Sequence, residues 1–185
     1  MRKFPIILLL VLVATQVMTS CFKDDKDDGG KYSDWKKANE AWVQEQINRV
    51  DGKANYYTTV QAPWDPNSVV YIHWFNDTML TRGNLRPFYT STVDVKYKAM
   101  LYDGTAVDSS YLRTSPAQGV FRTKLSGSVI EAWSLAVTRM HVGDSCLIIA
   151  PYNVAYGSTG SGSTVKPYSA MQFAIKLVDI YKLEK

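Results

Sequence analysis

The chain has 185 residues, of which 46% are apolar and 21% charged, proportions that are typical of a globular protein and exclude a disordered or fibrous one. It carries 21 Lys and Arg against 17 Asp and Glu, a net charge of +4, and no basic run outlines a surface for phosphates, so we expect no nucleic acid partner. The two histidines, His73 and His141, and the two cysteines, Cys21 and Cys146, lack the spacing of a zinc-type metal site, so no metal is expected. We expect no cofactor either.

The first twenty residues have the layout of a secretory signal. An apolar run covers 5–14, and small and polar residues fill 15–20. An apolar run of about ten residues is half of what a bilayer-spanning helix needs, which favours a cleaved signal over a permanent span. Residues 18–21, Met-Thr-Ser-Cys, resemble a bacterial lipobox, in which the signal is cleaved and Cys21 carries the lipid. A plain signal peptide with a coincidental cysteine is the alternative.

An acidic segment that ends in two glycines follows the signal. Residues 21–30 are too polar to fold alone, so we expect a solvated tether. The run resembles the acidic export signal that sends some lipoproteins to the outer face of the outer membrane, and a spacer without a sorting role is the alternative. These patterns predict a protein of the cell envelope that is anchored by an N-terminal lipid, with the outer membrane and its surface as the expected location.

Residues 31–90 are expected to form a helix and an extension packed on the rest of the protein. Apolar residues recur at helical spacing over 34–50, with Ser33 as the N-terminal cap and Asp51-Gly52 as the stop. We expect the two tryptophans of this helix to pack against the domain, and stacking on a cofactor is the alternative. Turn-forming residues follow at 53–68, then a short β-rich run at 69–75 and a long connection at 76–90.

The second half of the chain predicts an antiparallel sheet with one short helix. The clearest pattern is the alternation of apolar and polar residues at 93–101, which is typical of a half-buried strand and turns Tyr97 toward the core. A second alternation, at 171–177, turns Phe173 inward. Two further strands are expected at 120–125 and 146–150. A turn is expected at 103–104 and a short helix at 129–140. Because this order lacks βαβ alternation, it indicates an α+β fold with an antiparallel sheet.

Three patterns that are associated with other chemistries lack essential parts. The glycine-rich run at 157–162 has neither the helix nor the lysine of a phosphate-binding loop and is expected to be a mobile surface loop. Cys146 lies within a predicted strand, where we expect a buried, inert thiol instead of a nucleophile. Neither histidine belongs to a serine-hydrolase constellation, and the sequence has no Gly-x-Ser-x-Gly elbow.

Five elements in a fixed order resemble the FKBP-type peptidyl-prolyl cis-trans isomerases. They are YKAMLYDGTAVDSSY at 97–111, VIEAW at 129–133, MHVGD at 140–144, AYG at 155–157 and the final strand with its phenylalanine at 173. The resemblance covers about residues 92–182. It implies an antiparallel twisted sheet wrapped around one short α-helix, in an isomerase domain at 91–185 that carries the helical extension at 31–90.

The resemblance also implies a proline-binding pocket made mostly of aromatic side chains. The implied floor is Trp133, and the implied walls are Tyr97, Phe121 and Phe173. Val129 and Ile130 line one edge, and Asp108 and Tyr156 form the polar rim. In this family the backbone N–H at Ile130 would donate to a substrate carbonyl, and Arg113 matches the basic residue that steadies Asp108. Val107 is the clearest departure, because an aromatic residue is usual at its position.

The activity that the resemblance implies is rotation about X-Pro bonds of exported proteins, as folding assistance at the cell envelope. The expected partners are proline-containing polypeptides, macrolide-type inhibitors and a membrane that is reached through the lipid on Cys21. Two alternatives stay open. One is a catalytically weak binding or chaperone module, which Val107 favours, and the other is a surface lipoprotein whose function lies in residues 31–90.

Overall fold

The computed structural model describes residues 30–183. The predicted signal at 1–20, the lipid-bearing Cys21 and nearly all of the tether at 21–30 lie outside these residues. No helix within 30–183 has the length and the apolar character that crossing a membrane requires.

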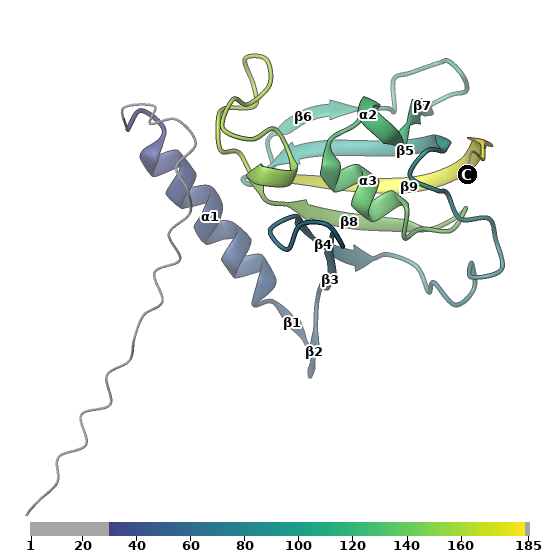
Figure 1. Cartoon of the computed structure of the whole chain (residues 1–185), viewed down its shortest axis with the longest axis horizontal. Coiled ribbons are helices and arrows are strands. Elements are labelled where there is room, and N and C mark those ends of the chain that lie inside the picture. Colours follow the sequence, from purple (N-terminus) through teal and green to yellow (C-terminus); the bar gives the residue numbers. More distant parts are fainter. Residues whose placement is uncertain (1–29, 184–185) are drawn as a thin grey trace, which may run out of the picture.

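A seven-stranded sheet forms the centre of the protein, and every pair of neighbouring strands is antiparallel (Figure 1). Its order is β3-β4-β8-β9-β5-β6, and β7 pairs with the first half of β5, on the side where β6 pairs with the second half. The strands are β3 (Thr58–Gln61), β4 (Val69–Trp74), β5 (Thr92–Leu101), β6 (Ala106–Ser109), β7 (Phe121–Lys124), β8 (Ser145–Ala150) and β9 (Met171–Lys182). The α+β fold with an antiparallel sheet is thus confirmed.

The remaining elements are short, apart from the first helix. They are α1 (Ser33–Ile47), the hairpin strands β1 (Val50–Asp51) and β2 (Ala54–Asn55), α2 (Leu125–Ser128), α3 (Glu131–Val137) and the 3-10 turn η1 (Tyr152–Val154). Figure 1 shows α2 and α3 against one face of the sheet. The alternation that predicted β5 is visible in its burial, since the side chains that face α3 are buried, namely Val93, Val95, Tyr97, Ala99 and Leu101.

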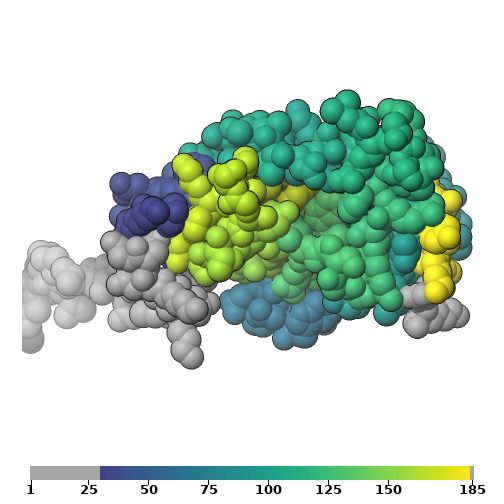
Figure 2. Space-filling view, turned by 90° about the horizontal axis from the view of Figure 1, so that it is seen from above, coloured from purple at the N-terminus to yellow at the C-terminus, as the bar shows by residue number. Residues whose placement is uncertain are grey.

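The first helix covers the opposite face of the sheet. In β8, Ile148 belongs to the core beneath α3, whereas its neighbour Ile149 packs with Val43 of α1 in a second cluster. Asn39, which is fully buried, donates to Trp35 O at 2.8 Å and accepts from the Ala170 N–H at 2.8 Å, so it joins α1 to the start of β9. In Figure 2 the purple α1 lies beside the yellow-green segment that follows β8.

Both tryptophans of α1 pack on the domain, as their spacing predicts. The indole N–H of Trp35 donates to Ser169 Oγ at 3.1 Å, and its ring meets Tyr102 edge-on at 5.2 Å. Trp42 also meets Tyr102 edge-on, with the ring centres 6.3 Å apart. Residues 31–90 supply β3 and β4 as well, so the extension contributes strands to the same sheet as the rest of the chain.

Three details of the sequence prediction were wrong. Ser33 is the first residue of α1 and not its cap, and the residue at the cap makes no side-chain hydrogen bond. The helix ends at Ile47 instead of residue 50, because 50–55 form the β1–β2 hairpin around Gly52, whose φ is +60°. The segment 53–68 contains β2 and β3 in addition to turns.

The internal helix is also shorter than the predicted 129–140. Gly127 has a φ of +74°, and the backbone of Val129 and Ile130 is extended, so α3 begins only at Glu131. The strand β9 is longer than predicted and runs past Leu177 to Lys182, where its side chains become exposed and the alternation fades.

Cys146 is fully buried in β8, and we expect its thiol to be unreactive in the native protein. Burial, with a further contribution from Asp144, raises the pKa of the Cys146 thiol to about 12. At pH 8 this lowers the thiolate fraction by about three orders of magnitude relative to an ordinary cysteine. In a Cys21→Ser variant, a thiol reagent should therefore label Cys146 only when denaturant is added. Fast labelling without denaturant would contradict this burial.

Candidate active site

Trp133 lies at the centre of an aromatic cluster between α3 and the sheet. Its ring meets Tyr97, Phe173 and Phe121 edge-on, with centroid separations of 4.9, 5.8 and 6.5 Å, respectively. Tyr97 also meets Phe121 at 5.6 Å. Trp133, Tyr97 and Phe173 are buried, whereas Phe121 is half-buried. The structure thus brings together the four aromatic residues that the resemblance singles out.

The register of the sheet explains why these residues meet. Opposite residues of an antiparallel pair point to the same face, and Ala99 of β5 lies opposite Phe173 of β9. Two residues earlier in β5, Tyr97 therefore projects to that face too. Val95 lies opposite Phe121, which adds the third aromatic ring from β7. Helix α3 then lays Trp133 across this face as the fourth ring.

A polar rim begins at the hydroxyl of Tyr97, which donates a hydrogen bond to Asp108 Oδ2. The backbone N–H of Ser109 donates to the other carboxylate oxygen at 2.7 Å. Burial, and then the hydrogen bond to Asp108, raise the pKa of the Tyr97 hydroxyl to about 12. At neutral pH the hydroxyl therefore keeps its proton and holds the carboxylate in place.

This Tyr97–Asp108 hydrogen bond goes beyond the predicted contacts. The signal that could have revealed it is the turn at Asp103-Gly104, which folds β6 back on β5 and places Ala99 opposite Asp108. Arg113 stacks its guanidinium 4.6 Å from the centre of the Phe121 ring. Its charge also opposes the rise in the pKa of Tyr97. The expected pairing of Arg113 with Asp108 stays a prediction.

Tyr156 lies after η1 and keeps its hydroxyl available. Burial, together with the charge of Asp108, raises the pKa of Tyr156, so the hydroxyl is a proton donor at neutral pH. Within residues 30–183 this hydroxyl makes no hydrogen bond to protein groups. It is therefore available to a ligand carbonyl.

Val129 and Ile130 form the bend between α2 and α3. Both are half-buried and pack against the core. The Ile130 carbonyl accepts from the Trp133 N–H at 3.0 Å, at the start of α3. Among the described residues, no acceptor is bonded to the Ile130 N–H. Because an unpaired N–H beside a cluster of apolar side chains is costly unless water or a ligand accepts from it, this group is a natural anchor for a carbonyl.

Together these groups form an apolar, aromatic site with donors at its border. Val107 is half-buried and packs against the core, at the position where the resemblance leads us to expect an aromatic residue. Its donors are uncharged at neutral pH, and the raised pKa values of Tyr97 and Tyr156 keep both hydroxyls protonated in alkaline solution as well. Such a site can hold a small apolar ring and orient the amides beside it, without forming a bond to the ligand.

Comparison with known proteins identifies the second half of the chain. A family model described as "FKBP-type peptidyl-prolyl cis-trans isomerase" matches residues 84–178, just over half of the chain. A macrophage infectivity potentiator of Trypanosoma cruzi is 37% identical over 98 residues, which are 53% of this chain and 47% of that protein. An FKBP-type 22 kDa peptidyl-prolyl cis-trans isomerase of Escherichia coli is 37% identical over 94 residues, 51% of this chain and 43% of that protein. The matched region thus spans less than half of either relative.

Solved structures extend the similarity of the fold to most of the described residues. FkpA from Escherichia coli superposes with a TM-score of 0.65 and 22% identity, over 84% of this chain and 65% of that chain. A peptidyl-prolyl cis-trans isomerase from Pseudomonas syringae pv. tomato superposes with a TM-score of 0.63 and 20% identity, over 85% of this chain and 98% of that chain. At these identities, the superpositions show a shared fold.

Proposed function

The chain belongs to the FKBP-type peptidyl-prolyl cis-trans isomerases, and from this membership we propose that it catalyses rotation about X-Pro bonds in polypeptides. The observation that carries the proposal is the four-ring cluster around Trp133, bordered by two donors, the Ile130 N–H and the Tyr156 hydroxyl. Neither donor has a hydrogen-bond acceptor among residues 30–183. We assign this function to residues 91–185, with 31–90 as an extension packed on them.

The chemistry requires no covalent intermediate. Rotating an X-Pro amide costs roughly 20 kcal/mol, because conjugation gives the C–N bond partial double character. In the twisted transition state conjugation is lost and the carbonyl becomes less dipolar, so a dry aromatic pocket favours this state over the planar ones. The cluster around Trp133 provides such surroundings, since three of its four rings are buried.

Each group of the site has a role in this proposal. The rings of Tyr97, Phe121, Trp133 and Phe173 hold the proline, and Val129 narrows one edge. The Ile130 N–H and the Tyr156 hydroxyl donate hydrogen bonds to the flanking carbonyls and fix the amide between them. Asp108 keeps the Tyr97 hydroxyl turned toward the rim through their hydrogen bond. Macrolide inhibitors of the family are expected to occupy the same pocket.

We expect Asp108→Ala and Tyr156→Phe to lower isomerisation of a short proline peptide while the protein stays folded. Each change removes one rim interaction, and a hydrogen bond is worth about 1 kcal/mol, or roughly a fivefold loss in kcat/KM. The measurement is peptide isomerisation, with thermal unfolding as the check on folding. Leu112→Ala is the control, since this side chain is 91% exposed. Wild-type rates in both rim variants would contradict the assignment.

A second candidate function is a binding or chaperone module with weak turnover. Val107 favours it, because valine leaves one side of the pocket without the ring that the family usually has there. Isomerisation by the wild-type protein at no more than the uncatalysed rate, together with binding of a macrolide inhibitor, would decide for this alternative.

For the cell, we propose a protein of the envelope that is held by a lipid on Cys21 and assists the folding of exported proteins. The support is the signal-like sequence of residues 1–20 and the acidic run after Cys21. The outer membrane is the proposed location.

Cys21→Ala should release the protein from membranes or leave its signal uncleaved. Without the cysteine no acyl chain can be attached, and acyl chains are the proposed anchor. Fractionation of cells, with the mass of the N-terminal peptide, measures both outcomes. Cys146→Ala is the control and should stay attached. Normal processing and membrane attachment of Cys21→Ala would contradict the lipoprotein hypothesis.

A further inference from the structure

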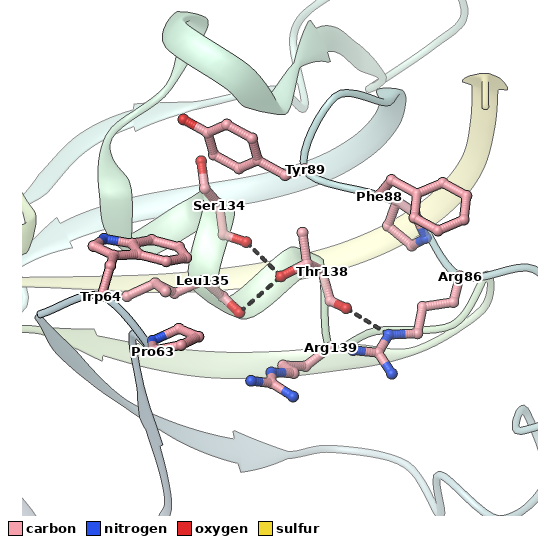
Figure 3. A pocket seen from close by; sticks show the side chains of 10 residues that line it. Pro63, Trp64, Arg86, Phe88, Tyr89, Ser134, Leu135, Thr138 and Arg139 are labelled. Carbon is pink, nitrogen blue, oxygen red and sulfur yellow. Dashed lines mark hydrogen bonds between the residues drawn. The ribbon is translucent and has the colours of Figure 1, made fainter. Parts of the chain in front are cut away.

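A groove of about 470 Å³ lies on the outer side of α3, away from the aromatic cluster (Figure 3). Its floor is formed by α3 and the residues after it, and its walls come from the β3–β4 loop and from the connection before β5. The side chains that matter here are Pro63, Trp64, Arg86, Phe88, Tyr89 and Arg139. We call this hollow the α3 groove.

The α3 groove and the proposed proline site at the aromatic cluster lie at different sides of one helix. Trp133 belongs to the pocket, whereas Leu135 lines the groove. Successive residues of an α-helix are about 100° apart, so side chains two positions apart point to nearly opposite sides. A ligand in the groove therefore leaves the pocket open to a proline.

The walls of the groove are held in place by hydrogen bonds. The Trp64 indole donates to Glu131 Oε1 at 3.3 Å, which fixes the ring beside the first residue of α3. Arg86 Nε donates to the Thr138 carbonyl at 2.6 Å. The Phe88 N–H donates to Ser91 Oγ at 3.0 Å. The groove is thus built before any ligand binds, which lowers the entropy cost of binding.

The groove exposes aromatic surface that the protein itself does not cover. Trp64, Phe88 and Tyr89 are 66%, 43% and 52% exposed. The same connection also exposes Met79, Leu80 and Leu85. Trp64, Phe88 and Tyr89 line one hollow, and large apolar side chains that gather on a surface mark an interaction site more often than scattered ones do.

One border of the groove, away from the Glu131 that holds Trp64, carries two positive charges. Arg86 and Arg139 both line the groove, and Figure 3 shows their side chains along the same border of it. In the described part of the chain, neither of them is paired with a carboxylate. Two guanidinium groups on the border of one groove favour an anionic group of a ligand there. The Arg86 Nε is bound to Thr138, so the outer face of this guanidinium is left for a ligand.

We propose that the α3 groove binds an extended segment of an unfolded polypeptide in which a large apolar side chain stands next to carboxylates. The apolar side chain lies between Trp64 and Phe88, and the carboxylates meet Arg86 and Arg139. The identification of the partner as a client of the enzyme rests on the proposed function, whereas the binding chemistry does not. A client held here is tethered beside the pocket, which raises the local concentration of its prolines.

The test uses a proline-free peptide, so that binding is measured apart from isomerisation. Fluorescein-labelled Gly-Ser-Leu-Phe-Asp-Asp-Ser-Gly is titrated with the full chain carrying Cys21→Ser, and anisotropy reports the dissociation constant. Trp64→Ala and Arg139→Glu should each weaken binding about tenfold, as expected for an aromatic anchor and a charge reversal at a small interface. Lys53→Glu is the matched control, since it makes the same charge change at the exposed β1–β2 turn and should alter binding less than about twofold.

Two further measurements decide between occupants. A saturating macrolide inhibitor should leave peptide binding unchanged, and Trp64→Ala should isomerise a short proline peptide at the wild-type rate. The proposal is overturned if the peptide fails to bind, if both groove variants bind it like the wild type, or if the inhibitor displaces it. It is also overturned if the chain forms a dimer that Trp64→Ala dissociates, because a second copy then fills the groove. If the peptide binds but the protein has no isomerase activity, the peptide site in the α3 groove is supported and the proposed function is refuted.

Discussion

Replacing Trp133 by alanine is expected to lower the free energy of unfolding by about 3–5 kcal/mol, enough to unfold a large fraction of a protein of ordinary stability. The indole is 5% exposed and contacts three other rings, so its removal leaves a cavity that the sheet and α3 cannot close together. Urea unfolding followed by circular dichroism gives the difference.

Trp64→Ala is the matched control for this experiment. It removes the same side chain at a position that is 66% exposed, so its cost should stay near or below about 1 kcal/mol. Isomerisation is expected to fall sharply in Trp133→Ala even where the variant is still folded. A Trp133→Ala protein with wild-type stability and no activity would mean that the ring is exposed, which would refute the pocket as described.

The second large effect is expected at Asp144, a fully buried carboxylate in the turn before β8. It accepts hydrogen bonds from the Thr81 hydroxyl, from Asn76 Nδ2 at 2.9 Å and from the His141 N–H at 2.7 Å. Asp144→Ala leaves three donors without their acceptor, and we expect a loss of about 3–5 kcal/mol. The control is Asp77→Ala, which removes an exposed carboxylate from the connection between β4 and β5. This carboxylate accepts from the Met79 N–H near the surface, so its loss should cost about 1 kcal/mol or less.

The contribution of Asp144 should also depend on pH. Burial alone would raise the pKa of this carboxyl, but the hydrogen bonds from Thr81, His141 and Asn76 lower it below its ordinary value. A group whose pKa is lower in the folded state stabilises the protein above its unfolded pKa, near 3.9, and loses this effect as the pH falls through the folded value. The stability gap between the wild type and Asp144→Asn should therefore be full at pH 7 and shrink below about pH 4. A gap that stays constant down to pH 2 would contradict this linkage.

The parts of the fold that the sequence predicts are those with a strong local period. The strand β5 alternates because one of its faces is buried, and Tyr97 points inward as that period requires. The short strand β3 was missed because three of its four residues are exposed and it pairs with β4 alone, so no apolar period marks it. The helix predicted from residue 129 begins later because the chain bends at Gly127, whose φ is positive, and the sequence pattern alone does not indicate this bend.

The same distinction applies to the site. The aromatic residues could be predicted from motifs that lie in order along the chain, because each motif is read from neighbouring residues. The hydrogen bond between Tyr97 and Asp108 depends on how β6 folds back on β5, and the stacking of Arg113 on Phe121 depends on a loop. The α3 groove joins Trp64 to residues more than sixty positions further on, and no short pattern in the sequence connects them.

The pairing of β4 with β8 has a consequence for how the protein can be divided. Without residues 31–90, the backbone N–H and C=O groups of β8 along this border would lose their partners, and Ile149 would lose its cover from α1. An unprotected strand border of this kind recruits strands from other molecules and leads to aggregation. In the intact chain the border is instead the four-residue β3, which is too short to recruit a long foreign strand. Residues 31–90 therefore protect this border of the sheet from pairing with other molecules. We expect them to fold and unfold together with residues 91–185 as one cooperative unit.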